Sequence, residues 1–373
     1  MSIPFSFEDP INKAILSVSE DRISGFSRRP LHEIAEKSGI PLEMVIERIQ
    51  AMLRAGSVRR VRQTLLTTSL APGALVAWKV PPLKLTEAFE FMFKEDPSSG
   101  HVVLRTTDGE SPGSKYRLWT TLKVPVGFSL AKHCAYLQAQ TGAETFKLLP
   151  ANKLFALGVG HVRRRELEVG ERTAEPGRVM DTVVTPLTIP EWQVLTALKR
   201  EFEPDELVPN LWDARAKEAG VDLETFLQVG ESLNARGLIG RFSTFLEHVK
   251  RHDDGSRVTQ FNALFHWRVP QGKEMEAGME VGRHCCMTHA YWREGGPEFM
   301  NANVMGVSHG MEKEKVLAHK AAIDAHLEEA GIPVLYTNVF WGGRSEIKPS
   351  EFSPISYAAW LKSRGIDPET MKE

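Results

Sequence analysis

The sequence predicts an α+β protein made of two tandem copies of one unit, each a winged helix-turn-helix followed by a ferredoxin-like βαββαβ domain. Three observations predict this fold class: a repeated helix-glycine-helix pattern, a repeated strand motif, and alternation of helical and β-branched segments after each repeat. The repeated helical positions are separated by 181 residues (220 − 39 = 181). The matching pairs are Gly39 and Gly220, Leu42 and Leu223, and Gly56 and Gly237.

The strand motifs recur in the same order along the chain. Trp78-Lys-Val-Pro81 matches Trp267-Arg-Val-Pro270, and His101-Val-Val-Leu-Arg105 matches His289-Ala-Tyr-Trp-Arg293. Because the offset drifts by only a few residues over the whole repeat, we interpret the pattern as a duplication.

The first part of each unit is expected to be a helix-turn-helix with a wing. In the first copy, a short helix over 31–37 ends near Gly39, which is a suitable C-cap residue. Pro41 suits the first turn of the following helix, which stops at Gly56. The segment 58–66 is rich in β-branched residues and is predicted to form the wing hairpin. The second copy repeats this pattern over 191–246.

The second part of each unit is expected to be βαββαβ. In the first copy the predicted elements are a strand over 74–80, a helix over 83–93, strands over 101–106 and 116–124, a helix over 129–140 and a last strand containing 154–158. In the second copy they are 261–269, 274–282, 287–293, 303–309, 312–330 and 334–341. Two such open sheets can cover each other, so we expect an intramolecular pseudo-dimer, which leaves further homo-oligomerisation open.

The expected domain boundaries follow from this repeat. They are a first winged helix at 1–70, a first ferredoxin-like domain at 71–160, a charged linker at 161–185, a second winged helix at 186–250, and a second ferredoxin-like domain with a C-terminal extension at 251–373.

The composition is that of an ordinary globular protein. With 42% hydrophobic and 25% charged residues, each domain can bury a core without a metal or a disulfide. A net charge of −2 argues against strong overall attraction to nucleic acid or membranes. The three cysteines, Cys134, Cys285 and Cys286, do not form a disulfide framework and favour a reducing compartment. Since neither a signal peptide nor a spanning apolar run occurs, we expect a cytoplasmic protein.

The helices predicted to read DNA carry acidic residues in their first turns. Glu43 in the first copy and Asp222 and Glu224 in the second would face phosphates, which costs affinity. The cations that favour DNA binding are Arg59, Arg60 and Arg62, in the expected wing of the first copy. We therefore expect both winged helices to be structural rather than nucleic-acid-binding.

A polar face is predicted on the second ferredoxin-like domain. Residues two apart on a strand share a face, so His289, Tyr291 and Arg293 point the same way, and His309 on the next strand can join them. Histidine can bind iron or donate a proton near neutral pH, and arginine binds carboxylates through two hydrogen bonds. Histidine on a strand is more often part of a structural hydrogen bond, and alternating Tyr and Arg also suit a solvent face.

With these motifs the sequence resembles the siroheme decarboxylases, which are Lrp/AsnC-like proteins that work as paired or fused subunits. The resemblance covers nearly the whole chain as architecture, and its specific motif is His289-x-Tyr291-x-Arg293 followed by His309-Gly310. The family removes acetate carboxyl groups from siroheme in haem or haem d1 biosynthesis. The resemblance implies a carboxy-lyase with an iron tetrapyrrole, siroheme or haem, as substrate or ligand and no required cofactor.

The resemblance also implies roles for residues. His289, His309 and Tyr291 would be catalytic, with His289 or His309 facing the iron of a bound tetrapyrrole, and the protein alone would hold no metal. The residues expected to bind the substrate are Arg293, His101, Arg105, Arg117 and Lys123. The first copy departs from the motif, since Val103 stands at the tyrosine position and its third strand lacks His-Gly. Ala290 stands where the family often has Asn.

Two alternatives share the same histidine site. One is an Lrp/AsnC-like transcriptional regulator that senses haem or a small effector and binds an operator. The other is a tetrapyrrole-binding protein without catalytic activity. Turnover of siroheme, ligand binding without turnover, and operator binding distinguish the three.

Overall fold

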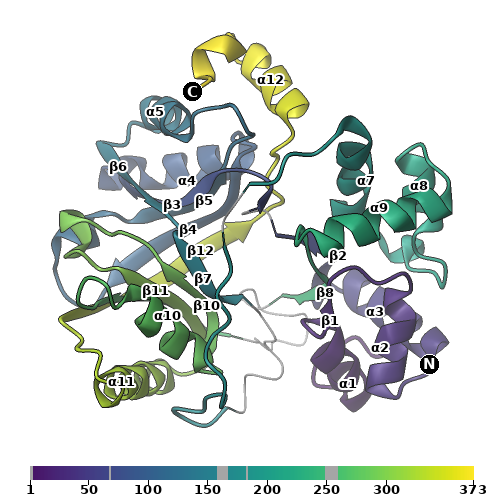
Figure 1. Ribbon diagram of the computed structural model, residues 1–373, viewed down its shortest axis with the longest axis horizontal. Coiled ribbons are helices and arrows are strands. Elements are labelled where there is room, and N and C mark those ends of the chain that lie inside the picture. The colour runs from purple at the N-terminus through teal and green to yellow at the C-terminus, as the bar shows by residue number, and fades with distance from the viewer. Residues whose placement is uncertain (1–2, 67–68, 158–166, 182–183, 248–258) are drawn as a thin grey trace. The chain divides into compact units, whose positions relative to one another are not determined.

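The computed structural model describes residues 3–66, 69–157, 167–181, 184–247 and 259–373 (Figure 1). The chain divides into two compact units. Unit 1 comprises Met1–Thr67, Gly158–Glu166 and Thr185–Gln260, and unit 2 comprises Thr68–Leu157, Leu167–Val184 and Phe261–Glu373. Each unit therefore collects the corresponding parts of both copies, so the first half of the chain does not fold apart from the second.

The described part of unit 1 holds two sets of three α-helices, the second with the additional 3-10 helix η4, and each set ends in a strand. In chain order its elements are α1 (Pro10–Ser19), β1 (Ile23–Ser24), α2 (Pro30–Ser38), α3 (Leu42–Arg54), β2 (Val58–Leu65), α7 (Ile189–Lys199), η4 (Pro204–Glu206), α8 (Asp213–Glu218), α9 (Leu223–Ala235) and β8 (Ile239–Leu246). Local signals set these bounds: Asp9 accepts hydrogen bonds from the first turn of α1, and α2 ends at Gly39 with a φ of 71°.

The predicted wing hairpin over 58–66 is wrong. This segment forms the single strand β2, which pairs antiparallel with β8 of the second copy, and β1 pairs with the other edge of β8. The physical reason is that 58–66 contains no glycine, proline or asparagine at which a strand could reverse. Pairing the two strands satisfies their backbone groups instead.

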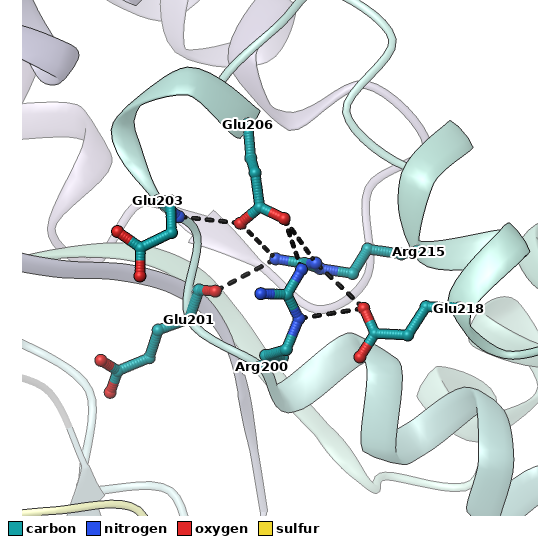
Figure 2. Close-up of polar contacts among 6 residues, drawn as sticks. All are labelled: Arg200, Glu201, Glu203, Glu206, Arg215 and Glu218. Carbon is teal, nitrogen blue, oxygen red and sulfur yellow. Dashed lines mark hydrogen bonds and ion pairs between the residues drawn. The ribbon is translucent and has the colours of Figure 1, made fainter.

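A charge network around the buried Arg215 holds the second helical set together (Figure 2). The Arg215 side chain is 1% exposed, donates to both carboxylate oxygens of Glu206, and lies over the Phe202 ring at 4.3 Å. Arg200 donates to Glu206 and to Glu218, 2.9 Å away for the latter. Because each cation has carboxylate partners within the network, we interpret it as structural.

Unit 2 holds the ferredoxin-like parts of both copies. Its first-copy elements are β3 (Gly73–Lys79), η2 (Pro82–Lys84), α4 (Leu85–Lys94), β4 (Ser99–Thr107), η3 (Pro112–Lys115), β5 (Leu118–Lys123), α5 (Leu130–Thr141), β6 (Thr145–Pro150) and β7 (Lys153–Leu157). Its second-copy elements are β9 (Phe261–Arg268), α10 (Glu274–Arg283), β10 (Met287–Trp292), η5 (Pro297–Phe299), β11 (Val304–Gly310), α11 (Lys313–Glu329), β12 (Tyr336–Ile347), α12 (Pro354–Ser363) and η6 (Pro368–Met371).

All these strands belong to one sheet with the order β6-β3-β5-β4-β12-β9-β11-β10-β7 (Figure 1). Each copy contributes the same order, β6-β3-β5-β4 and β12-β9-β11-β10. Strand β12 joins them, because its first half pairs with β9 and its second half pairs with β4. At the far edge, β7 from the first copy pairs with β10 from the second.

The strand predicted over 154–158 therefore needs correction. The last strand of the first βαββαβ pattern is β6, which pairs with β3, whereas β7 pairs with the second copy. The two segments are separated only by Ala151 and Asn152, so the sequence pattern alone does not separate them.

An apolar core lies between the inner faces of the two halves of the sheet. Its residues come from both copies: Ala77, Val103, Tyr116, Trp119, Leu149, Leu264, Phe299, Ala302, Met305 and Phe340. The opposite faces pack separate cores that include residues of α4 and α5 in the first copy and of α10 and α11 in the second. We call the side of the sheet facing the shared core the inner face.

The predicted linker over 161–185 is only partly described, since 161–166 and 182–183 lie outside the described residues. The part that is described packs on unit 2 rather than spanning freely. Leu167 is 8% exposed within the core beside α10 and α11, and Met180 exchanges two backbone hydrogen bonds with Leu154. His161 and the run 163–165 lie outside the described residues. Within the described ranges, no helix is long and apolar enough to cross a membrane.

Candidate functional site

Strand β10 turns His289, Tyr291 and Arg293 toward the inner face. The alternate residues Ala290 and Trp292 pack in or against the core on the helix side. The His289 and Tyr291 rings are stacked with centroids 6.0 Å apart, and the Arg293 guanidinium lies 4.3 Å from the Tyr291 centroid. Burial raises the pKa of Tyr291, although the nearby Arg293 opposes this shift. The phenol is therefore protonated at neutral pH.

A chain of hydrogen bonds joins His289 to His309. The Thr288 hydroxyl donates to the Val307 carbonyl oxygen, 2.9 Å away. Its oxygen lies 3.1 Å from His289 Nδ1 and 3.5 Å from His309 Nδ1, so it can accept from either ring. Thr288 reaches both histidines because β10 shifts its register against β11 between Met287 and His289.

Asn262 and Arg105 continue this chain from His309. Asn262 Nδ2 lies 3.0 Å from His309 Nε2, and Arg105 Nη1 donates to Asn262 Oδ1 over 3.2 Å. Arg105 can only donate, which orients the Asn262 amide so that its nitrogen donates to His309. His309 Nε2 must then accept, which describes a neutral imidazole protonated on Nδ1. We call the set Thr288, His289, His309, Asn262 and Arg105 the histidine chain.

Arg105 and Arg293 occupy equivalent positions in the two copies. The Arg105 backbone NH donates to the carbonyl of Arg117, and that of Arg293 to the carbonyl of Asn303. Each guanidinium also reaches a backbone carbonyl of the other copy, Arg105 to Phe340 and Arg293 to Leu149. Both side chains are thus part of the contact between the copies, a role that the sequence does not indicate.

Among the described residues, neither of these buried arginines has a carboxylate partner. Arg105 is 5% exposed and Arg293 is 8% exposed, and neither Nε atom has a hydrogen-bond partner. Burial lowers the pKa of Arg105 to about 9. Burial also lowers the pKa of Arg293, which the Tyr291 hydroxyl partly offsets. Uncompensated buried cations are costly, so this face is suited to an anionic ligand.

The first-copy residues expected to bind the substrate differ in their burial and in their neighbours. Lys123 lies at the end of β5, half-buried and close to Arg293. Burial, and then Arg293, lowers the pKa of Lys123 to about 7. His101 Nε2 lies 2.7 Å from the Ser345 hydroxyl of β12. The Arg117 side chain is exposed just before β5 and is not a member of the histidine chain.

Sequence reasoning missed Asn262, Thr288 and Gly73. Asn262 follows from the duplication only after the strands are aligned, since it stands at the position of Gly73 in the first copy. Thr288 contacts both histidines only because of the irregular pairing of β10, and a two-residue alternation cannot anticipate that irregularity.

His284 belongs to a different cluster. It caps the end of α10, is 1% exposed, and its Nε2 lies 2.8 Å from His326 Nδ1. His326 Nε2 in turn lies 3.0 Å from a Glu280 oxygen. Of the adjacent cysteines, Cys286 is buried and Cys285 is half-buried. Among the described residues, no three His, Cys, Asp or Glu side chains are arranged to hold a metal ion.

The arginines considered for DNA binding do not form a free basic patch. Arg60 is 9% exposed and pairs with Glu201 over 3.2 Å. Arg62 lies 5.4 Å from the Phe245 ring of β8. Burial, and then Arg60, lowers the pKa of both Arg59 and Arg62 to about 10.

Each helix predicted to read DNA is also held by the other copy. On α9, Glu224 and Glu231 bind Arg28, and Asn234 accepts from the Phe26 backbone NH. On α3, Gln50 donates to the Leu207 carbonyl, 3.1 Å away, and Arg54 pairs with Asp205. Phe26 and Leu207 are equivalent under the 181-residue offset (207 − 26 = 181). Each copy therefore contacts the helix of the other copy through an equivalent segment.

Part of the first copy is similar to a known family of domains. Residues 71–156 match the family model described as the AsnC-like ligand binding domain. This match covers β3 to β7 almost completely, and it agrees with the Lrp/AsnC-like resemblance drawn from the sequence. No curated protein sequence matches the chain.

Solved structures of one enzyme share the fold over nearly the whole chain. A crystal structure of the siroheme decarboxylase NirDL aligns with 95% of this chain and 99% of its own, with a TM-score of 0.64 and 20% identity. A second structure of NirDL, in complex with an iron-uroporphyrin III analogue, aligns equally well. The chain therefore has the fold of a siroheme decarboxylase, as the sequence resemblance predicts.

Proposed function

We propose that the chain binds an iron tetrapyrrole on the inner face of unit 2 and removes acetate carboxyl groups from it, with siroheme as the substrate. The observation that carries this proposal is the histidine chain beside buried arginines that have no carboxylate partner in the described parts of the chain. Siroheme presents eight carboxylates, and a cationic face with imidazoles fits such a ligand. The fold shared with NirDL supports the same substrate class.

The reaction needs a proton and no oxidant. Loss of carbon dioxide from a pyrrole acetate breaks the bond between the methylene carbon and the carboxyl carbon, and its electron pair remains on the methylene carbon. The macrocycle delocalises that charge until a proton converts the methylene into a methyl group. The donor is then reprotonated from solvent, so atoms and charge balance.

The hydrogen bonds favour different roles for the two histidines. His309 is held as a neutral imidazole by Asn262 and Arg105, which makes it a poor proton donor in this arrangement. His289 Nδ1 instead lies beside the Thr288 hydroxyl oxygen, which can accept a hydrogen bond from a protonated imidazole. We therefore assign His289 as the proton donor and His309 as the neutral partner that faces the tetrapyrrole. Tyr291, protonated and stacked on His289, orients the carboxylate.

The test is anaerobic incubation of the protein with siroheme, followed by mass analysis of the tetrapyrrole. The expected product has lost carbon dioxide, and His289→Ala and His309→Ala are expected to lower turnover by about 100-fold or more, since a positioned acid contributes about that factor. His32→Ala, in unit 1, is the matched control and should keep full activity. Unchanged turnover in His289→Ala or His309→Ala would remove that residue from the mechanism.

Binding without a mass change would instead support the non-catalytic tetrapyrrole-binding alternative. The regulator alternative requires DNA binding. Two observations oppose it: α3 and α9 are each held by contacts from the other copy, and Arg60 is paired with Glu201. Operator binding by the whole protein would reinstate it.

A further inference from the structure

Two cations lie close together on the inner face, outside the histidine chain. Lys123 comes from β5 of the first copy and Arg293 follows β10 of the second copy. A Cβ atom built on Gly73 would lie 3.3 Å from Lys123 Nζ, which shows that the lysine extends over β3. Arg293 donates to Leu149 of β6, the strand that pairs with β3. Both cations therefore converge over the same pair of strands.

The duplication gives this pair a counterpart in the histidine chain. Trp78 pairs with Leu118 in the first copy, as Trp267 pairs with Val304 in the second. Counting along these strands makes Lys123, paired with Gly73, the equivalent of His309, paired with Asn262. Arg293 and Arg105 are equivalent by their own backbone contacts.

The two equivalent arrangements differ in the residue that lies between the two polar side chains. In the second copy, the Asn262 carboxamide bridges Arg105 and His309. Its oxygen accepts from Arg105 and its nitrogen donates to His309. In the first copy, glycine at position 73 contributes no side chain between Lys123 and Arg293. Lys123 and Arg293 also repel each other, which lowers the pKa of Lys123 beyond the effect of its burial.

Nothing among the described residues compensates these two charges. Arg293 is more than nine-tenths buried, and its Nε has no hydrogen-bond partner. None of the interactions that shift the pKa of Lys123 or Arg293 comes from a carboxylate. Lys123 is only half-buried, and Thr121, two residues earlier on the same face of β5, is exposed, so a small solute can approach.

We propose that Lys123 and Arg293 form a carboxylate-binding site over Gly73, in which the ligand's carboxylate bridges the two cations as the Asn262 carboxamide bridges its neighbours. One carboxylate oxygen accepts from Lys123 Nζ and the other from the guanidinium of Arg293. The ligand is either a small free carboxylate or a carboxylate side chain of a larger molecule. The site does not depend on decarboxylation, because binding requires only these two cations.

The experiment measures how fast Lys123 reacts with an amine-acetylating reagent in the intact wild-type protein, with each lysine quantified by mass spectrometry. An anion bound to Lys123 covers the amine and favours its protonated form, so acetate or succinate should slow its labelling by about tenfold at about ten times the Kd. Acetamide, which has the same shape and no charge, should have no effect. Lys115, an exposed lysine of the same copy, is the internal control.

A second measurement uses variants. Succinate should raise the melting temperature of the wild type, of Lys123→Arg and of the control Lys115→Met, but not that of Lys123→Met. Protection by acetate or succinate supports a site for free carboxylates, and protection only by iron uroporphyrin supports a site for a tetrapyrrole side chain. Absence of protection by all three overturns the proposal. Since labelling needs no turnover, this result is separate from the outcome of the decarboxylation assay.

Discussion

His266 is an unusual residue to find in the middle of the shared core. It is fully buried, and neither ring nitrogen has a hydrogen-bond partner among the residues that the structure describes. Its ring packs against Phe340, with centroids 4.6 Å apart, and against Phe299 and Trp119. Burial, and then Arg105, lowers its pKa from 6.5 to about 3. The repeat offset of 189 places Ala77 at the equivalent position of the first copy (266 − 77 = 189), so the fold itself does not need an imidazole here.

We expect His266→Leu to flatten the acid dependence of stability. In the unfolded chain this imidazole takes up a proton below about pH 6.5, whereas in the folded protein it stays neutral down to about pH 3. The contribution of His266 to stability is therefore fully present above about pH 6.5. Below that pH the free energy of unfolding falls by about 1.4 kcal/mol for each pH unit. Between pH 7 and pH 5 the wild type should lose about 2 kcal/mol more than the variant.

Denaturant unfolding of the two proteins at pH 7 and pH 5 measures this difference. At pH 7 the variant should be at least as stable as the wild type, because leucine removes two unpartnered buried nitrogens. Equal losses on acidification would show that His266 titrates normally. His284, whose pKa burial and His326 also lower to about 3, contributes the same trend to both proteins.

At the scale of elements, the C-terminal helix α12 is fastened to the first copy by a buried polar triad. Tyr357 on α12 lies 2.7 Å from His133 Nδ1 of α5, and His133 Nε2 lies 3.0 Å from Asp96. Burial pushes the pKa of Asp96 upward, but His133 and hydrogen bonds from Ser99 and the Ser98 backbone outweigh it, so the pKa is below its ordinary value. The carboxylate is therefore ionised inside the protein.

Tyr357→Phe should loosen this helix. The substitution leaves a buried ring nitrogen of His133 without its partner, which costs about 1–3 kcal/mol. Amide hydrogen exchange should rise along α12 while the exchange of β9 and β11 stays unchanged. The half-buried Tyr336 gives the control variant Tyr336→Phe, which should leave exchange at α12 unaltered. Unchanged protection of α12 in Tyr357→Phe would show that apolar contacts alone hold the helix.

The sequence predicts most helices and strands but not how strands from the two copies pair. Helical segments show apolar spacing and glycine ends that are local signals, as at Gly39. The pairing of β2 with β8, and of β7 with β10, joins residues that are far apart in the chain and leaves no local pattern. At the site, alternation along one strand places His289, Tyr291 and Arg293 on one face. Asn262 comes from β9, and it joins the site through the register that sets it opposite His309 of β11, which alternation along one strand does not reveal.

At the scale of the whole molecule, the strand exchange in unit 2 makes the two copies mutually dependent. Strand β10 pairs with β7 of the first copy, and β12 pairs with β4. The shared core also draws residues from both copies. A second copy by itself exposes two unpaired strand edges and half of this apolar core, which favours aggregation.

We expect the fragment 261–373 to fail to fold alone and to be rescued by the fragment 69–181. The amide chemical shifts of 261–373 should be poorly dispersed or their signals broadened. The shifts should become well dispersed when the two fragments are co-expressed. As a control, the full chain purified in the same way should give a dispersed spectrum. A monomeric, well-dispersed spectrum from 261–373 alone would contradict the dependence.

The covalent link between the copies also changes what evolution can do at the sites between them. In a symmetric homodimer, one codon specifies both members of every equivalent pair, so a substitution that improves one site alters the other at the same time. In this chain His309 and Lys123, Asn262 and Gly73, and Tyr291 and Val103 are encoded separately. One gene can thus keep a histidine on one side while the other side changes independently, without the two ever assembling in the wrong combination.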